Sequence, residues 1–116
     1  MFVALYAPYS QVFPRCAAIV HQGGVGTTGM AMLAGKPMLI VPYGWDQPDQ
    51  AARIVRMGAG LTIGRKRYSA GRAARALKIL IEEDAFTRRA GEMREAMQAE
   101  DGRTSACDAI EAVMRR

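Results

Sequence analysis

Short apolar runs alternate with helical patterns along most of the chain. Four runs are mainly apolar and predict buried strands, because a strand that is covered on both faces shows no polar alternation. They span residues 2–5, 17–20, 37–42 and 61–63. Between and after them, apolar residues recur at helical spacing. This spacing predicts a short helical turn at 10–13, helices at 27–34 and 46–57, and further helices from Ser69 onward.

The predicted helices carry end signals and apolar stripes. Gly35 and Gly58 stand where two of them should stop. Ser10, Asp46 and Thr104 stand where three of them should start. The later helices carry apolar side chains at helical spacing, in one stripe at 73–81, a second at 93–97 and on a last helix after Thr104. These side chains are Ala73, Ala76, Leu77, Leu80, Ile81, Met93, Met97, Ile110 and Val113.

Strands that alternate with helices predict an α/β fold, a Rossmann-like parallel sheet sandwiched by helices. We expect a single domain over residues 1–116, since the chain is long enough for one core and too short for two. Ligands of such sheets bind beyond the carboxyl ends of the strands. Tyr6, His21 and residues 43–46 follow predicted strands, so we expect these segments to meet at one edge of the sheet.

The formal net charge of +5 resides entirely in the second part of the chain. Residues 1–50 contain two basic and two acidic residues, and the remainder contains 14 basic and 9 acidic ones. From Arg72 onward the two signs are interleaved at helical spacing, which is typical of a solvated helix face. We therefore expect no nucleic-acid partner.

Cysteine and histidine usage argues against a metal site and against secretion. Cys16 and Cys107 are far apart and His21 is the only histidine, so no zinc site of ordinary ligand spacing can form. We expect two reduced thiols in a cytoplasmic protein, with Cys16 as a small core residue. The opening MFVALYA lacks the charged region of a signal peptide, and no apolar stretch is long enough for a transmembrane segment.

A glycine-rich run, HQGGVGTT, lies between a predicted strand and a predicted helix. Free N–H groups and the helix dipole favour an anion there, and Gly23, Gly24 and Gly26 leave room for it. The hydroxyls of Thr27 and Thr28 add two donors. The alternative is a turn that needs glycine only for its backbone angles. The run also matches G-x-G-x-x-G, but no acidic residue ends the next strand, so a dinucleotide is not expected.

The polar and aromatic positions near this run have two interpretations each. His21 is either a structural residue or a donor to a pyrophosphate, whose negative charge would favour the protonated imidazole. Asp46 and Gln47 offer the carboxylate and carboxamide that suit sugar hydroxyls, while Asp46 is also a good helix N-cap. Trp45 either stacks on a sugar ring or covers the core.

Three motifs at these spacings resemble a known family. H-x-G-G-x-G-T-T, A-G-x-P and P-x-x-x-D-Q occur at 21–28, 34–37 and 42–47. Together they resemble the C-terminal half of a family 1 glycosyltransferase of the GT-B fold. The chain is most similar to bacterial and fungal sterol, rhamnosyl and glycopeptide-antibiotic transferases. The resemblance is tight over residues 2–64 and looser over the helical tail.

The resemblance implies a donor-binding site. His21 contacts the donor diphosphate, helped by the loop amides and Thr27, while Asp46 and Gln47 hold hydroxyls of the donor sugar. The full set of implied donor-binding residues is Tyr6, Ala7, Tyr9, His21, Gly23, Gly24, Val25, Gly26, Thr27, Trp45, Asp46 and Gln47.

The nucleotide base is implied to lie near the start of the chain. Tyr6 takes the place of a base-stacking tryptophan, Ala7 offers a main-chain group to the base, and Tyr9 replaces a common glutamine. Plant relatives have a ribose-binding glutamate near Met30, and this sequence lacks it.

The implied reaction is an inverting displacement that moves a hexose from a nucleotide sugar, expected to be a UDP-sugar, to a small lipophilic acceptor. No cofactor and no metal is implied. His21 stabilises the departing diphosphate, and the general base is a histidine of an N-terminal domain that this chain lacks. We therefore expect the chain to bind nucleotide sugar but to catalyse no transfer by itself.

Three interpretations of the chain remain open at this point. The chain is either part of a protein that supplies the missing N-terminal half, or a subunit that completes its site with a separate partner chain. A third possibility is a noncatalytic interaction domain that forms a homo-oligomer through an exposed sheet edge.

Overall fold

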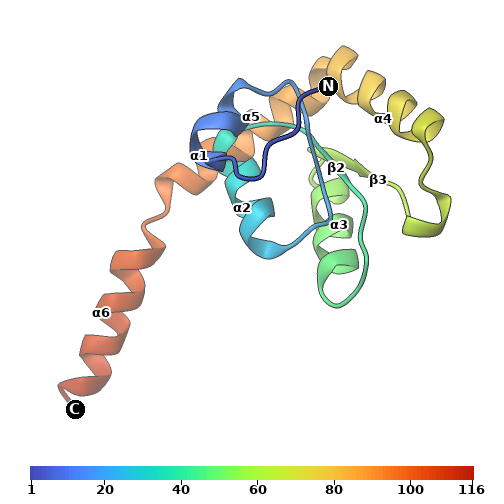
Figure 1. Cartoon of the computed structure of the whole chain (residues 1–116). Coiled ribbons are helices and arrows are strands. Elements are labelled where there is room, and N and C mark those ends of the chain that lie inside the picture. The colour runs from blue at the N-terminus through green and yellow to red at the C-terminus, as the bar shows by residue number, and fades with distance from the viewer.

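A three-stranded parallel sheet forms the centre of the computed structural model, which describes all 116 residues (Figure 1). The strands are β1 (Ile19–His21), β2 (Met38–Ile40) and β3 (Gly60–Thr62), in the spatial order β1-β2-β3. Val20 lies opposite Leu39, and Leu39 lies opposite Leu61. Three of the four predicted strands are present, and the α/β fold class is confirmed.

Helices connect the strands and continue after the last of them. Helix α2 (Val25–Ala34) joins β1 to β2, and α3 (Gln47–Arg56) joins β2 to β3. The other elements are α1 (Tyr9–Val12), the 3-10 turns η1 (Phe13–Arg15) and η2 (Arg65–Arg67), α4 (Ala70–Glu82), α5 (Asp84–Ala99) and α6 (Gly102–Met114). Gly35 ends α2 in the left-handed conformation that the sequence predicts, with φ of 65°.

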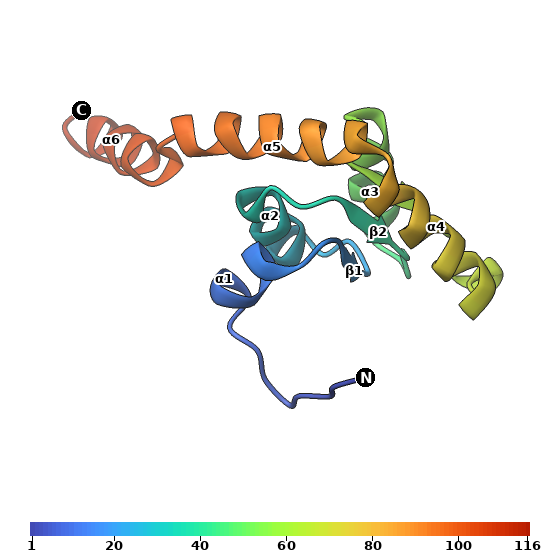
Figure 2. The ribbon, with the colours of Figure 1, turned by 90° about the horizontal axis from the view of Figure 1, so that it is seen from above.

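The two faces of the sheet are covered by different helices, as Figure 2 shows from above. Met38 and Ile40 point to one face of the sheet, and Leu39, which lies between them in β2, points to the other. One face packs against α2, α3 and α5, in a core that includes Met38 and Ile40. The other face packs mainly against α4, where Leu39 lies in one cluster with Ala73, Ala76 and Leu80, and Phe86 of α5 borders this cluster. Because α4 contacts β2 and β3, Val20 of β1 stays half-exposed on this face.

The prediction of a strand at residues 2–5 is wrong. This stretch forms no strand, and its large side chains are almost fully exposed. Figure 2 shows the N-terminal stretch running away from α1, without a neighbouring strand. Apolar residues form a strand only where a second strand accepts their backbone hydrogen bonds. The described sheet ends at β1, and residues 2–5 do not reach its edge.

Two of the predicted helix starts are also wrong. Helix α1 begins at Tyr9 after Pro8, so Ser10 lies inside it. Helix α6 is capped by Asp101 and not by Thr104, because the Asp101 carboxylate accepts from the Thr104 backbone N–H at 3.1 Å and from its hydroxyl at 2.6 Å. These two bonds hold the pKa of Asp101 below its ordinary value. Thr104 lies three residues after the capping residue and donates hydrogen bonds to the Asp101 side chain.

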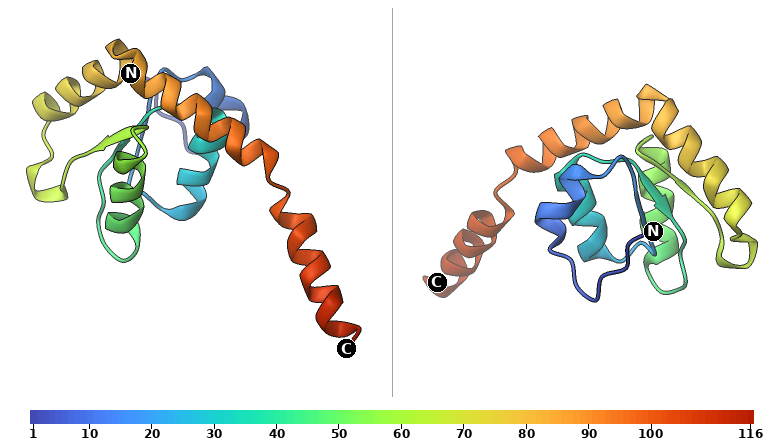
Figure 3. Two further views of the ribbon diagram at one scale, coloured as in Figure 1. Left: turned by 180° about the vertical axis from the view of Figure 1, so that it is seen from behind. Right: turned by 45° about the horizontal axis from the view of Figure 1, so that its top comes forward.

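Helix α6 projects away from the rest of the chain (Figure 3). None of its residues is buried, and Ile110 and Val113, which the sequence pattern places on this helix, are both exposed. Ile81 in α4 is exposed as well. Cys16 was predicted to lie in the core, but its side chain is only partly buried and borders the core. Both cysteines are free thiols.

Candidate functional site

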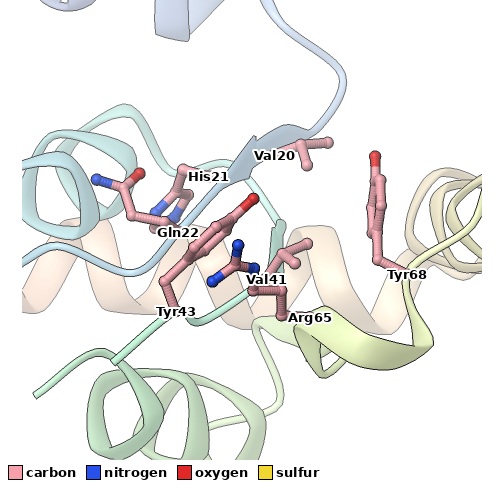
Figure 4. Close-up of a pocket in the computed structure, with 7 residues that line it drawn as sticks. All are labelled: Val20, His21, Gln22, Val41, Tyr43, Arg65 and Tyr68. Carbon is pink, nitrogen blue, oxygen red and sulfur yellow. The ribbon is translucent and has the colours of Figure 1, made fainter. Parts of the chain in front are cut away.

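The loops after the three strands meet at one edge of the sheet, because all three strands run in parallel. A pocket of about 420 Å³ opens at this edge on the face next to α4 (Figure 4). Its lining residues are Val20, His21, Gln22, Val41, Tyr43, Arg65 and Tyr68. His21 and Tyr43 therefore meet at this edge, as the strand pattern predicts, whereas Tyr6 does not line the pocket.

His21 ends β1 with one ring nitrogen engaged and the other free. The backbone N–H of Gly23 donates to Nδ1 at 3.0 Å, so the proton of a neutral imidazole lies on Nε2. Nε2 is buried and has no hydrogen-bond partner. Burial lowers the pKa of His21 from its ordinary value of 6.5, so the imidazole is neutral near pH 7. The site therefore contains a neutral N–H donor without a hydrogen-bond acceptor.

The lowered pKa of His21 predicts a pH-dependent stability. The folded state binds this proton less readily than the unfolded state, so protonation favours unfolding. The resulting stability is complete above pH 6.5 and is lost as the pH falls below that value. We expect the free energy of unfolding to fall more steeply for the wild type than for His21→Gln between about pH 7 and about pH 5. Urea denaturation at each pH measures this, and equal slopes for the two proteins would contradict it.

Helix α2 presents a set of unpaired backbone donors directly after residues 22–24, which we call the glycine loop. Gly24 is the N-cap and supplies no side chain. The N–H groups of Val25, Gly26 and Thr27 make no hydrogen bond within the chain. An anion at this helix end would find three N–H groups and the positive end of the helix dipole.

The two threonines of α2 differ in what they offer to a ligand. The Thr28 hydroxyl is buried and donates to the carbonyl oxygen of Gly24 at 2.8 Å, so it is not available as an anion donor. The prediction that Thr28 adds a donor is wrong for this reason. Thr27 is only partly buried, and its hydroxyl forms no hydrogen bond in the chain.

Gly23 joins the glycine loop to the start of α3. Its φ of +95° is one that other residues rarely adopt. A Cβ atom at this position would lie 2.9 Å from Ile40 Cγ2 and 3.2 Å from the carbonyl oxygen of Gln47. Glycine is therefore required here, and the glycine loop lies directly against residue 47, on the same side of the sheet.

Asp46 and Gln47 lie at the start of α3, and their side chains make different contacts. Asp46 occupies the N-cap position, but its carboxylate accepts no capping hydrogen bond and is exposed. Gln47 turns its side chain back, and Oε1 accepts from the N–H groups of Tyr43 at 2.8 Å and Gly44 at 3.3 Å. The Asp46 carboxylate is thus free for a ligand, while Gln47 also holds the preceding loop in place.

Trp45 is presented to solvent on that loop. Its side chain is 93% exposed, so it does not cover the core, and that alternative is wrong. It is the only non-glycine residue with positive φ, at 54°. A left-handed conformation costs a bulky residue about 1–2 kcal/mol. The loop therefore holds an indole ring in an unfavourable conformation beside Asp46.

The predicted base-binding residues lie on another part of the chain. Tyr6 is exposed in the N-terminal stretch, and Ala7 next to it is partly buried. Tyr9 stacks on Phe13 with ring centroids 4.4 Å apart, and it lines a small hollow with Met30 of α2. None of the three predicted residues lines the pocket at the sheet edge.

Sequence reasoning placed Tyr43 at this edge but missed Arg65, which lies beside it. Tyr43 follows β2 and Arg65 follows β3, and the Arg65 guanidinium carbon lies 4.5 Å from the centroid of the Tyr43 ring. From the sequence, Arg65 is interpreted only as the start of a turn, because the basic run 65–67 follows an apolar segment that ends in Gly64. Its place directly after a parallel strand was the signal that could have identified it.

A family model matches residues 2–113, almost the whole chain. Its description is "Erythromycin biosynthesis protein CIII-like, C-terminal domain". The chain belongs to this family. The expected resemblance to the C-terminal half of GT-B glycosyltransferases is thereby confirmed.

Relatives of this EryCIII-like domain are glycosyltransferases of much greater length. It is 41% identical over 90% of its length to O-mycaminosyltylonolide 6-deoxyallosyltransferase of Streptomyces fradiae, and spans 25% of that protein. It is 33% identical over 95% of its length to sterol 3-beta-glucosyltransferase of Vanderwaltozyma polyspora, and spans 9% of that protein. The described chain therefore corresponds to a small part of these enzymes.

Solved structures agree with this assignment. The EryCIII-like domain superimposes on spinosyn forosaminyltransferase SpnP with a TM-score of 0.93 at 24% identity, covering 100% of this chain and 31% of that one. It superimposes on glycosyltransferase VinC, solved in complex with dTDP, with a TM-score of 0.78 at 36% identity. That match covers 81% of this chain and 24% of VinC. The likeness to SpnP shows the shared fold, and VinC has the higher sequence identity of the two.

No helix of the EryCIII-like domain combines the length and the apolar composition that crossing a membrane requires.

Proposed function

We propose that this chain binds the nucleoside diphosphate part of a sugar donor at the carboxyl edge of its sheet. The observation that carries the proposal is the group of unpaired donors there. These are the buried Nε2–H of His21 and the free N–H groups at the start of α2. Unpaired buried donors are costly unless a ligand accepts from them, and a diphosphate offers several anionic oxygens.

The relative VinC supports a diphosphate as the ligand. It is 36% identical to this chain and was solved in complex with dTDP. The sequence resemblance points to UDP-sugars, so both nucleotides belong in a test. The shared chemistry is a pyrimidine nucleoside diphosphate. Gly24, Val25, Gly26 and Thr27 would contact the phosphate oxygens.

The sugar would lie at the neighbouring corner. Gly23 lies so close to Gln47 that a Cβ atom on it would be 3.2 Å from the Gln47 carbonyl oxygen. The glycine loop and the start of α3 are therefore adjacent. The free Asp46 carboxylate can accept from sugar hydroxyls, and the Gln47 amide nitrogen can donate to them. Trp45 offers an exposed ring for stacking on the sugar.

The base would extend toward the start of the chain. Tyr6 has an exposed ring that can stack on a pyrimidine, and Ala7 offers main-chain groups to its edge. Tyr9 is already stacked on Phe13, so its hydroxyl end alone is available for a contact. These three positions rest on the family resemblance.

The reaction that fits this site is hexosyl transfer with inversion. An acceptor hydroxyl attacks the anomeric carbon, the bond to the diphosphate oxygen breaks, and the acceptor's proton goes to a general base. Negative charge grows on the departing diphosphate, where the His21 N–H and the α2 dipole stabilise it. The family resemblance implies that the general base is a histidine of an N-terminal domain outside this chain, while His21 would serve the leaving group. A small lipophilic acceptor is the expected substrate class.

The acceptor would be bound by another part of a longer protein or by a partner chain. The edge of β1 is unpaired and Val20 is 46% exposed beside it. An open strand edge of this kind accepts a further strand. A second copy of the chain could fill the same edge as a homo-oligomer, which is the alternative function as an interaction domain.

Nucleotide titration tests the proposal. We expect dTDP or UDP to bind the wild-type chain, with affinity about tenfold lower in His21→Ala because one donor to an ionised group is lost. Thr27→Ala should weaken binding by a smaller factor, since a single hydroxyl is removed. Isothermal titration calorimetry measures both.

Ser105→Ala on the exposed helix α6 is the matched control, and it should bind like the wild type. Equal affinities for the wild type and His21→Ala would remove His21 from the site. Absence of binding by the wild type would overturn the proposed function.

A further inference from the structure

Arg65 is held in one place at the mouth of the pocket. Its guanidinium carbon lies 4.5 Å from the centroid of the Tyr43 ring, within cation–π distance. Figure 4 shows the Arg65 guanidinium beside the Tyr43 ring, with His21 and Gln22 lining the same pocket. The two residues come from different strand ends, since Tyr43 follows β2 and Arg65 opens η2 after β3.

No carboxylate neutralises the charge of Arg65. The four ion pairs of the chain involve other residues, and the pocket contains no acidic side chain. Residues 50–81 contain eight lysines and arginines and no aspartate or glutamate. Arg65 is therefore a positioned cation without an anionic partner.

The pocket has no other permanent positive charge. His21 is neutral near pH 7 because burial lowers its pKa, and it can only donate one hydrogen bond. A diphosphate brings at least two negative charges, which neutral donors do not balance. A guanidinium presents its N–H groups in a planar fork that matches the oxygens of a phosphate.

We propose that Arg65 binds the diphosphate of the sugar donor, with Tyr43 as the residue that positions its guanidinium. The inference rests on the proposed function and adds a contact from the third strand end to it. The backbone of Tyr43 is held in place, because its N–H donates to Gln47 Oε1 at 2.8 Å. The same hydrogen bond thus links the sugar corner to the cation that meets the diphosphate.

Arg67 provides a matched control for Arg65. It belongs to the same 3-10 turn, has the same charge and is also exposed. It lines a different hollow, together with Arg72 and Arg75 of α4. Arg65→Gln and Arg67→Gln therefore change net charge and local sequence equally and differ only in the pocket affected.

The experiment is calorimetric titration of dTDP and UDP into the full 116-residue chain and its variants, at two salt concentrations. We expect Arg65→Gln to lower affinity about tenfold and to reduce its salt dependence, and Arg67→Gln to change affinity less than about twofold. Arg65→Lys keeps the charge without the fork and should recover part of the loss.

Variants of Tyr43 test whether this residue acts by positioning the Arg65 guanidinium or by contacting the nucleotide directly. Tyr43→Phe keeps the ring beneath the guanidinium and should bind like the wild type. Tyr43→Leu removes the ring and should lose about threefold in affinity. In the Arg65→Gln background the same Leu substitution should have no further effect, because the residue that it positions is gone.

The outcomes separate this inference from the function on which it rests. A wild type that binds neither nucleotide overturns both. A wild type that binds, with His21→Ala weakened and Arg65→Gln equal to Arg67→Gln, overturns the role of Arg65 alone. Circular dichroism and thermal unfolding of each variant establish that the fold is retained, and Arg65→Lys gives the decision if Arg65→Gln fails to fold.

Discussion

Gly60→Ala is expected to destabilise the chain by about 3 kcal/mol, because there is no space for one extra carbon at this position. Gly60 begins β3 and is buried opposite Met38. A Cβ atom there would lie 2.5 Å from the Met38 carbonyl oxygen and 2.8 Å from Ile54 Cγ2. The carbonyl belongs to the neighbouring strand, so relief requires β3 to move away from β2. Urea denaturation of the two proteins measures the loss.

Gly64→Ala is the control for this substitution. Gly64 lies just beyond the same strand, with φ of −61° and ψ of 141°, which alanine adopts without strain. No atom lies within 4 Å of a Cβ at this position. We expect a change below about 0.5 kcal/mol, or a slight gain from reduced freedom of the unfolded chain. Equal stabilities of Gly60→Ala and Gly64→Ala would contradict the close approach of β3 to β2.

The strands that the sequence predicted correctly are those that have partners in the chain. The runs at 17–20, 37–42 and 61–63 correspond to β1, β2 and β3, with ends that differ by one or two residues. The run at 2–5 is also apolar but forms no strand. The apolar pattern indicates that a segment favours burial. To form a strand, the segment must also pair with the unpaired edge of a neighbouring strand, and composition does not specify that pairing.

The same distinction applies to the helices. Ala73, Ala76 and Leu80 are buried because α4 lies on the sheet, so their spacing was informative. Ile110 and Val113 have a similar spacing on α6, but nothing in the described chain lies against them. A periodic stripe thus predicts a helix reliably, and predicts burial only when a partner surface exists.

The candidate site was predictable where its parts are adjacent in sequence or follow a strand. His21 and the glycine loop share one strand–helix junction, and Asp46 and Gln47 begin the next helix. The contact between Gly23 and Gln47, and that between Tyr43 and Arg65, are tertiary. They depend on the order of strands and on the paths of loops, which spacing along the chain does not specify.

Gly26→Ala is expected to lower nucleotide affinity about 100-fold while leaving the fold intact. Gly26 lies in the first turn of α2, and a Cβ there would have no atom within 4 Å, so the fold does not require glycine. Helical Cα–Cβ bonds tilt toward the N-terminus, so the added methyl would lean toward the unpaired N–H groups of Val25 and Gly26. Displacing a phosphate from one or two such donors costs about 1.5–3 kcal/mol each. Calorimetric titration of dTDP and UDP measures the loss.

Gly29→Ala separates this effect from a general change in α2. Gly29 lies in the same helix, also has open space around a Cβ, and stands beyond the unpaired first turn. Both substitutions should raise the free energy of unfolding by about 0.5–1 kcal/mol, because alanine replaces glycine within a helix. Only Gly26→Ala should weaken binding. A stabilised Gly26→Ala that binds nucleotide as well as Gly29→Ala would mean that the helix end is not where the diphosphate lies, whatever the affinity of the wild type.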